Sequence, residues 1–290
     1  MADSRPRAAD DMAEDTFDLE ELEAALAGSR FAGKLHFFPS IDSTNTHAMR
    51  EAEAGAADGS VYFADEQTAG RGRGAHRWES AVGAGLYASV LLRPRLQATD
   101  ALWLSLAAGL AVQNAVRQVT SLEADLRWPN DLLLGRRKFC GILTELSAES
   151  PAQQRTAAGT EARVRHAVVG IGINVQQAEF PRELREVATS LRIETEREWP
   201  RQELLVALLQ SLESEVMALT EPAEQAAQSI CRRLEAGSTW IRGKRVRVEE
   251  RGDGEGGFAG VTEGLDARGF LRVRTAAGIR TVISGGVRED

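Results

Sequence analysis

From Lys34 onward, short apolar runs bounded by turn residues alternate with segments of helical periodicity. A strand places successive side chains on opposite faces, whereas a helix repeats its apolar residues every three to four positions. The alternation of the two patterns predicts an α+β or mixed α/β domain. The strand candidates are KLHFF, VYFADE, GLYASVLL, DLRW, GILTELS and HAVVGIGINV.

Helical patterns precede, interrupt and follow these runs. The clearest lies at residues 100–119, where Leu and Val recur at helical spacing. Two more are expected at 201–219 and 221–236, and a short one at 17–28 ends at a glycine. The segment 1–15 has no apolar periodicity and is expected to be frayed. Such a leader is too short for a helix-turn-helix DNA-binding domain, which needs about three helices.

After Trp240 the sequence changes to short alternating runs interrupted by glycines, including GKRVRVEE, FLRVRT and TVISGGV. This pattern is typical of a small five-stranded barrel. We therefore expect a leader at 1–30, a main domain at 31–238 and a small β domain at 239–290. The polar stretch 147–160 between two strand candidates is interpreted as a hairpin loop.

The net charge is −8, from 35 Lys plus Arg and 43 Asp plus Glu. An acidic chain is a poor general partner for nucleic acid. Basic residues nevertheless cluster locally, in one group at Arg71, Arg73 and Arg77 and in another at 136–138. Local clusters of this kind favour a small phosphate ligand over a polyanion.

The two cysteines, Cys140 and Cys231, lie far apart, and there are only four histidines. These residues predict no zinc site and fit a reducing cytoplasm. No run approaches the apolar length of a membrane span, and the acidic N-terminus is unlike a signal peptide. We expect a cytoplasmic protein with no membrane partner.

The segment Thr68–Trp78, TAGRGRGAHRW, lies between two strand candidates. Glycines allow the backbone to approach an anion, and Arg71 and Arg73 carry forked donors suited to a phosphate or carboxylate. An exposed hairpin with solvated arginines is the competing interpretation.

A second segment, Leu126–Leu146, begins LRWPNDLLLGRRKF. Asn130 can pair with a base edge or a carbonyl, and Asp131 can hold a metal or an amine. A tight hairpin around Gly135 would bring Lys138 beside Asp131, where its charge could stabilise a carboxylate attacking a phosphoryl group. The alternative is an ordinary turn with a lysine facing water.

Two further segments carry polar or glycine residues in unusual places. In Val168–Val175, VVGIGINV, glycines inside a strand indicate either a close-lying ligand or a bulge. In Ser40–Ala52, Ser43 or Thr44 is expected to cap a helix. The other hydroxyl, with Asn45, could then face a polar ligand.

Four of these segments, in this order, resemble the biotin protein ligase family across roughly residues 36–287. They are STN at Ser43–Asn45, GRGRG at Gly70–Gly74, RWPND at Arg127–Asp131 with KFCGIL from Lys138, and GIGIN at Gly170–Asn174. The resemblance implies a central mixed or antiparallel sheet flanked by helices, as in class II aminoacyl-tRNA synthetases, with a C-terminal SH3-like barrel.

The implied reaction activates biotin with ATP, accompanied by Mg²⁺, to biotinyl-AMP. A lysine of a biotin carboxyl carrier domain, from acetyl-CoA carboxylase or a related carboxylase, then displaces AMP. Many relatives form dimers through the central sheet, and the sequence leaves open whether this chain does.

The resemblance also implies roles for individual residues. Lys138 looks like the catalytic cation, Asp131 like a carboxylate needed for activation or for the acceptor amine, and Arg71 and Arg73 like the closing arginines of the biotin loop. Trp78 resembles the aromatic wall for adenine. The remaining candidates for binding biotin or nucleotide are Ser43, Thr44, Asn45, Gln67, Gly70, Gly72, Gly74, Asn130, Gly141, Gly172 and Asn174.

Three positions depart from the family pattern. Arg127 stands where a lysine is usual, Ala75 where a glycine is common, and Gly286 where a glutamate is common. Arg127 keeps the charge but changes its geometry. The Ala75 change concerns the fine conformation of the biotin loop.

Three other functions share some of these features. A lipoate ligase or octanoyl transferase would share the fold and a corresponding lysine, but GRGRG together with RWPND argues against it. A repressor that senses biotinyl-AMP would need a DNA-binding domain. A biotin-binding protein without catalysis is disfavoured by Lys138, Asp131 and the two loop arginines.

Overall fold

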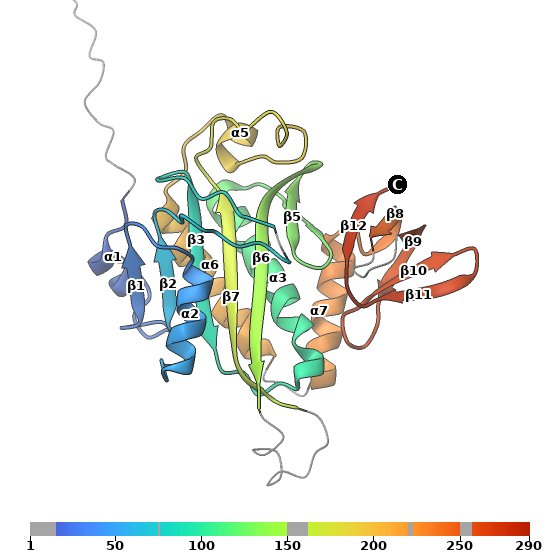
Figure 1. Ribbon diagram of the computed structural model, residues 1–290, viewed down its shortest axis with the longest axis horizontal. Coiled ribbons are helices and arrows are strands. Elements are labelled where there is room, and N and C mark those ends of the chain that lie inside the picture. Colours follow the sequence, from blue (N-terminus) through green and yellow to red (C-terminus); the bar gives the residue numbers. More distant parts are fainter. Residues whose placement is uncertain (1–15, 75, 150–161, 220–222, 250–256) are drawn as a thin grey trace, which may run out of the picture.

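The computed structural model describes residues 16–74, 76–149, 162–219, 223–249 and 257–290. Within these ranges the main element is a seven-stranded sheet in the order β1-β2-β3-β7-β6-β5-β4 (Figure 1). Only the β1–β2 pair is parallel among the described pairs, so the sheet is mixed. The strands are β1 (Leu35–Phe38), β2 (Val61–Ala64), β3 (Gly85–Leu92), β4 (Asp125–Arg127), β5 (Asp131–Leu134), β6 (Arg137–Ala148) and β7 (Val164–Asn174).

Helices cover both faces of this sheet. The helix α2 (Thr44–Glu53) packs on β2, β3 and β7. On the opposite face, α3 (Leu102–Thr120) and α6 (Arg201–Ala218) pack against each other and against the sheet (Figure 1). The other helices of the described chain are α1 (Leu19–Ala25), the 3₁₀ turn η1 (Ala98–Asp100), α5 (Leu191–Thr195) and α7 (Ala223–Gly237).

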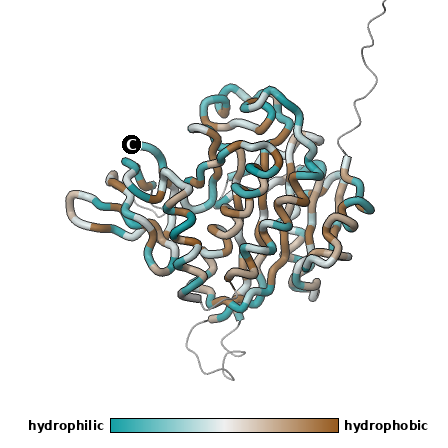
Figure 2. Tube along the Cα trace, turned by 180° about the vertical axis from the view of Figure 1, so that it is seen from behind, coloured by the Kyte–Doolittle hydropathy of each residue, from teal (hydrophilic) through white to brown (hydrophobic). Residues whose placement is uncertain are grey.

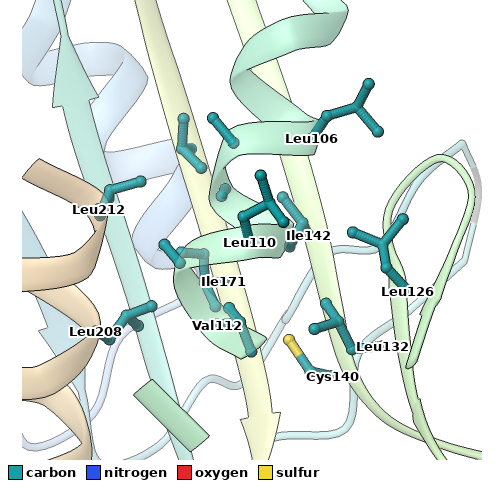
Figure 3. Packing of buried hydrophobic residues seen from close by; sticks show 14 of the residues in the cluster. Leu106, Leu110, Val112, Leu126, Leu132, Cys140, Ile142, Ile171, Leu208 and Leu212 are labelled. Atoms are coloured by element: carbon teal, nitrogen blue, oxygen red, sulfur yellow. The ribbon is translucent and has the colours of Figure 1, made fainter. Parts of the chain in front are cut away.

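The main hydrophobic core lies between the sheet and the α3–α6 pair. Leu106 and Leu110 of α3 pack near Ile142 of β6 and Ile171 of β7 (Figure 3). Seen from behind, these helices and strands carry long hydrophobic stretches (Figure 2). At Gly109 an added Cβ would collide with Leu126, so α3 approaches the sheet closely there. Burial of this apolar surface is the principal stabilising contribution to the domain.

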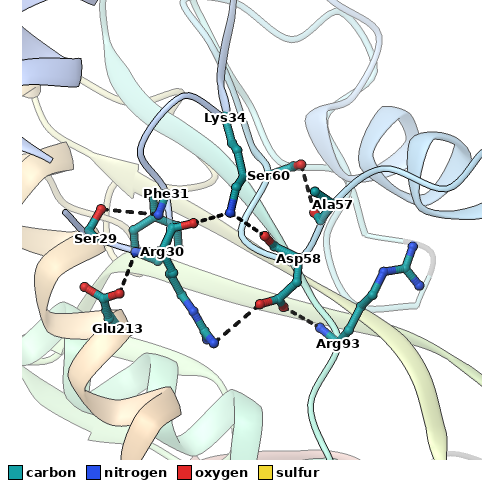
Figure 4. Close-up of polar contacts among 9 residues, drawn as sticks. All are labelled: Ser29, Arg30, Phe31, Lys34, Ala57, Asp58, Ser60, Arg93 and Glu213. Carbon is teal, nitrogen blue, oxygen red and sulfur yellow. Dashed lines mark hydrogen bonds and ion pairs between the residues drawn. The ribbon is translucent and has the colours of Figure 1, made fainter. Parts of the chain in front are cut away.

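The start of the domain is tied to the sheet by a polar cluster around Asp58 (Figure 4). Lys34 Nζ donates to the carbonyl oxygens of Arg30 and Asp58, at 2.6 and 2.9 Å. The Asp58 carboxylate accepts from the backbone N–H of Arg93 at 2.7 Å. These bonds join the chain before β1, the turn before β2 and the end of β3.

A second sheet is formed by the C-terminal part of the chain. Within the described ranges it has five strands in the order β11-β10-β9-β8-β12. Its core joins that of the main domain through Trp240 and Ile241. In addition, the indole Nε1 of Trp128 donates to the carbonyl of Gly269 at 2.9 Å. The strands are β8 (Arg242–Glu249), β9 (Phe258–Leu265), β10 (Leu271–Thr275), β11 (Gly278–Val282) and β12 (Gly286–Glu289).

The predicted fold class is confirmed: a mixed sheet flanked by helices, followed by a small antiparallel β domain consistent with an SH3-like fold. The helix expected at 100–119 is α3, and the hairpin expected around Gly135 joins β5 to β6. The short helix α5 was not predicted from the sequence. The frayed segment expected at 1–15 and most of the loop expected at 147–160 lie outside the described residues. Domain boundaries at 30 and 238 stay predictions.

None of the described helices combines the length and apolar character needed to cross a membrane.

Candidate active site

Three glycines lie together on the face of the large sheet that α2 covers. Gly170 and Gly172 are two residues apart on β7 and so share a face, and Gly141 of β6 pairs directly with Gly172. Since none has a side chain, the sheet is hollowed here. We call these three residues the glycine floor. The hollow above it is lined by residues of α2, the Gly70–Gly74 loop and strands β3, β6 and β7.

Side chains lie in close contact with this floor. A Cβ added at Gly172 would come within 2.6 Å of the Trp78 indole, and one at Gly141 within 3.0 Å of Lys138 Nζ. At Gly170 it would collide with the amide of Asn45. The pairing of β6 with β7 is regular through Gly170 and Gly172. The alternative interpretation of these glycines as a β-bulge is therefore wrong.

The first turn of α2 supplies polar groups at one end of the hollow. Ser43 is the N-cap, and its Oγ accepts from the N–H of Thr46 at 3.4 Å. The Thr44 N–H, which has no partner within the helix because it lies in the first turn, donates to Gln67 Oε1 at 2.9 Å. Thr44 and Asn45 are buried and line the hollow. The expectation that Ser43 or Thr44 caps the helix is confirmed for Ser43, and the expectation that Thr44 and Asn45 face a ligand stays a prediction.

The loop Gly70–Gly74 lies over the hollow. Gly72 N–H donates to the carbonyl of His76 at 2.8 Å, which closes the loop as a hairpin. At Gly70 an added Cβ would collide with the carbonyl of Trp78, and Gly74 adopts φ 72°, a left-handed value that favours glycine. The departure noted at Ala75 lies outside the described residues.

The two loop arginines point to different partners. Arg71 donates from both terminal nitrogens to the Glu145 carboxylate, at 2.8 and 2.9 Å. Arg73 Nη1 donates to the carbonyl of Gly285 at 3.0 Å, in the turn before β12. The loop thus contacts both the large sheet and the C-terminal sheet, and the contact to the C-terminal sheet lies next to the departure at Gly286.

The hairpin β5–β6 brings Lys138 beside Asp131, as the sequence predicted. Lys138 Nζ lies 2.6 Å from Asp131 Oδ1, and Arg127 Nη2 lies 2.8 Å from Asp131 Oδ2. Burial opposes ionisation of the Asp131 carboxyl, but the charges of Lys138 and Arg127 outweigh it and hold its pKa below the usual value. Asp131 is therefore an ionised partner that fixes Lys138 at the edge of the hollow.

The Trp78 indole lies against Gly172 and Gly141 of the glycine floor, next to this lysine. Lys138 Nζ lies 5.3 Å from the centre of the Trp78 ring, within range of a cation–π contact. The indole Nε1 is buried without a hydrogen-bond partner among the described residues. Trp78 is thus a planar wall of the hollow, the position in which an aromatic ring could stack on a ligand.

The two asparagine candidates have different surroundings. Asn130 lines the hollow while its Nδ2 donates to the carbonyl of Ile142 at 2.8 Å. The Asn174 side chain is buried and donates to the carbonyl of Thr189 at 3.0 Å. Asn174 is thus held away from the residues that line the hollow.

Most of the residues singled out in the sequence come together around the hollow. Gly70, Gly74, Asp131 and Asn174 lie outside its lining. Those that line it are Ser43, Thr44, Asn45, Gln67, Arg71, Gly72, Arg73, Trp78, Asn130, Lys138, Gly141 and Gly172.

Sequence reasoning missed three residues here. Ser89 is fully buried on β3 and bonds to Thr44 and Asn45. Glu145 on β6 holds Arg71 and Asn45. Gly170 was quoted within GIGIN but was not predicted to bind a ligand. Glu145 could have been found from its spacing, because it lies two residues from Leu143 and four from Gly141, which puts all three on one face once β6 is identified.

Among the described residues, no group of three His, Cys, Asp or Glu side chains lies close enough together to hold a metal ion. Both described carboxylates beside the hollow are already engaged, Asp131 by Lys138 and Arg127, and Glu145 by Arg71 and Asn45. Most ligands of a metal ion at this site would therefore have to come from the substrate and from water.

Two family models match the chain. Residues 37–174 match the biotin/lipoate A/B protein ligase family, and residues 242–287 match the biotin protein ligase C-terminal domain. The first match contains α2, the Gly70–Gly74 loop, Lys138 and the glycine floor. The second corresponds to the small C-terminal sheet.

Relatives that cover most of the chain are also found. The bifunctional ligase/repressor BirA of Bacillus spizizenii is 32% identical over 85% of this chain and 71% of its own. The biotin–acetyl-CoA-carboxylase ligase of Mycobacterium tuberculosis is 34% identical over 83% of this chain and 82% of its own. A biotin protein ligase from Aquifex aeolicus, solved in complex with biotin and ATP, superposes with a TM-score of 0.72 at 30% identity, covering 89% of this chain and 100% of that one.

The fold and the hollow thus define a protein ligase of the biotin/lipoate type. The relatives that cover most of the chain narrow this class further, and the chain belongs to the biotin protein ligase family.

Proposed function

We propose that this protein activates biotin with ATP and transfers it to a lysine of a biotin carboxyl carrier domain. The observation that carries the proposal is the convergence of Arg71, Arg73 and Lys138 on one hollow above the glycine floor. Three cations around one hollow suit a reaction in which anions meet and charge develops on a phosphorus centre.

In the first step, a carboxylate oxygen of biotin attacks the α-phosphorus of ATP. A P–O bond forms, the bond to the β-phosphate oxygen breaks, and pyrophosphate leaves. Lys138 is oriented by Asp131 at 2.6 Å and supplies positive charge at the edge of the hollow. Because the pKa of Asp131 is lowered by Lys138 and Arg127 despite its burial, we assign it to holding this lysine rather than to accepting a proton.

In the second step, the acceptor amine attacks the carbonyl carbon of the mixed anhydride and AMP leaves. The intermediate is reactive toward water, so the site must exclude solvent until the acceptor arrives. The Gly70–Gly74 loop, held by Arg71 on Glu145 and by Arg73 on Gly285, is the element we assign to this task.

The binding groups divide the hollow into two ends. We assign Ser43, Thr44 and Gln67 to the urea ring of biotin, because they gather polar atoms at the start of α2. Trp78 and Asn130 line the same hollow and are assigned to the nucleotide. Mg²⁺ would enter as part of the ATP substrate, held by phosphate oxygens and water, which fits the engaged state of Asp131.

The acceptor we propose is the carrier domain of acetyl-CoA carboxylase, the substrate named for the M. tuberculosis relative. A cytoplasmic location and pairing of two copies through the large sheet stay predictions from the sequence.

The test is biotin-dependent exchange of labelled pyrophosphate into ATP, with lipoate as the parallel substrate. Exchange with biotin alone is expected. Exchange with lipoate instead would identify lipoate as the substrate. No exchange with either acid would contradict the proposal that the protein activates a carboxylate with ATP.

A further inference from the structure

The backbone of Lys138 is held by a segment that belongs to neither β5 nor β7. Along β6, the pairing with β7 begins only at Cys140, so Lys138 lies outside it. Instead, the Lys138 N–H donates to the carbonyl of Val187 at 2.8 Å, and the Lys138 carbonyl accepts from the Thr189 N–H at 2.9 Å. Residues 187–189, which we call the lysine support, thus pair with β6 where β7 no longer does.

Glu194 of α5 fastens the lysine support to β6. Its Oε1 accepts from Thr189 Oγ1 at 2.6 Å and from Arg137 Nη2 at 2.6 Å. Thr189 belongs to the lysine support, and Arg137 directly precedes Lys138 on β6. One carboxylate oxygen therefore joins the two pieces of chain whose pairing places Lys138. In Figure 1, α5 lies beyond the end of the sheet at which β6 begins.

Two further bonds hold the lysine support from behind. Asn174 Nδ2, at the end of β7, donates to the carbonyl of Thr189 at 3.0 Å. Ser190, the next residue, is the N-cap of α5, and its Oγ donates to the carbonyl of Gln177 at 2.6 Å. Thr189 and Ser190 are both fully buried. The support is thus fixed to β7 and α5, and the carboxylate of Glu194 connects it to a side chain of β6.

None of the side chains that make this connection lines the hollow. Glu194, Arg137 and Thr189 all lie outside its lining, whereas Lys138 is part of it. Any effect of Glu194 on the chemistry must therefore pass through another residue. Lys138 Nζ lies 2.6 Å from Asp131 Oδ1, and Asp131 belongs to β5. The geometry of this ion pair therefore depends on where the beginning of β6 is held.

We propose that Glu194 is a positioning residue for Lys138, because it fixes the point of the backbone from which the lysine side chain reaches the hollow. The inference rests on the proposed function, in which the charge of Lys138 acts on the reacting phosphate. A lysine stem is flexible, so its ion pair with Asp131 does not by itself fix Nζ. A displacement of about 1 Å at a catalytic group can lower a rate by as much as about 100-fold.

The experiment compares Glu194→Ala with Glu194→Gln in the full chain. Alanine removes the acceptor shared by Arg137 and Thr189, whereas glutamine keeps an oxygen that can accept from both. The measurements are kcat and KM for biotin-dependent exchange of pyrophosphate into ATP, and the Kd for biotin by calorimetry.

E194A is expected to lower kcat roughly tenfold with an unchanged Kd for biotin, and E194Q to restore most of the loss. A normal kcat in E194A would overturn the inference. So would a Kd that rises as much as kcat falls, because the hollow itself would then be disturbed. An E194Q variant as slow as E194A would overturn it as well, since the two joining bonds are kept.

A Lys138→Ala background tests whether Glu194 acts through this lysine. With no ammonium group left to position, E194A should lower the residual exchange rate no further. The same loss in both backgrounds would mean that Glu194 acts through a different group, and the proposal would be abandoned.

Thr189→Val is a second variant that leaves α5 intact. Valine keeps the shape of threonine and removes only the hydrogen that Glu194 accepts, while the backbone bond from residue 189 to Lys138 remains. A several-fold lower kcat with an unchanged Kd is expected, and T189V should add nothing to E194A. Normal exchange by T189V would contradict the assigned link.

Glu198 provides the matched control, because its carboxylate pairs with Arg192 of α5 at 3.0 Å instead of with β6 or the lysine support. Glu198→Ala should leave kcat, KM and the Kd for biotin unchanged. A loss equal to that of E194A would give Glu194 a merely structural role. If the wild-type protein shows no biotin-dependent exchange, the proposed function fails. If it does and E194A exchanges equally fast, only the inference about Glu194 fails.

Discussion

Strand β7 has two faces that differ sharply in composition. Toward α3 it presents Val169, Ile171 and Ile173, all buried in the main core. Toward α2 it presents Val168, Gly170 and Gly172, of which only Val168 belongs to a hydrophobic cluster. The residues that stabilise the strand and those that leave room for a ligand thus alternate along one short segment.

This alternation shows how a central strand can carry a site without losing its place in the sheet. Glycine inside a strand weakens it, because it adds backbone freedom and no packing. Here the cost falls on one face only, and the β-branched residues on the other face are buried in the main core together with residues of α3 and α6. The two faces should therefore respond differently to substitution.

The largest expected effect is on the core face. Ile173→Ala removes a fully buried side chain and should lower the free energy of unfolding by about 2–5 kcal/mol, as large-to-small core substitutions do. Denaturant unfolding measures this, and calorimetry should give an unchanged Kd for biotin. A large loss of biotin affinity in the folded variant would mean that the two faces are not independent.

Lys138→Ala should show the converse behaviour on the ligand side. Loss of a charge that acts on the reacting groups should slow pyrophosphate exchange by about 100–1000-fold. Biotin affinity should change much less, because the lysine acts mainly on developing charge. Lys138→Met, which keeps the apolar stem, is the control for packing on Trp78. If affinity falls as far as the rate does, the lysine binds substrate rather than promoting the reaction.

Gly172→Ala tests the glycine floor directly. The new methyl group would lie 2.6 Å from the Trp78 indole, so the ring must move. We expect roughly tenfold weaker binding of biotin or ATP, with the free energy of unfolding changed by about 1 kcal/mol or less, since alanine is favoured over glycine in a strand. Unchanged affinity for both ligands would show that neither uses this part of the hollow.

Much of this arrangement could be predicted from local sequence. The period of apolar residues indicated α3, and the turn residues around Gly135 indicated the hairpin that pairs Lys138 with Asp131. Each of the motifs STN, GRGRG and RWPND supplies residues that line one hollow, although RWPND supplies only Asn130. These features depend on neighbours close in the chain, where spacing and turn chemistry are informative.

The rest depends on register between distant segments. That Gly141 lies beside Gly172 follows from how β6 pairs with β7, which their own sequences do not state. Glu145 meets Asn45 across 100 positions of chain, and Ser89 meets Asn45 across 44. Asn174 was predicted to bind the ligand because it ends the motif GIGIN. Its side chain instead donates to the carbonyl of Thr189 and does not line the hollow.

The smallest effect is expected from the loop that covers the ligand face. Arg73 Nη1 donates to Gly285 of the C-terminal sheet, so Arg73→Gln should loosen the cover and let the adenylate escape before an acceptor arrives. The escape is measured as biotin attached to lysines of a bystander protein, detected with streptavidin, and a several-fold increase is expected at nearly normal exchange rates. Arg136→Gln is the matched control, because Arg136 also contacts the C-terminal sheet, at Glu289, but does not line the hollow. Background labelling by Arg73→Gln, or equal labelling by both variants, would show that the ligand face is not sealed by this arginine.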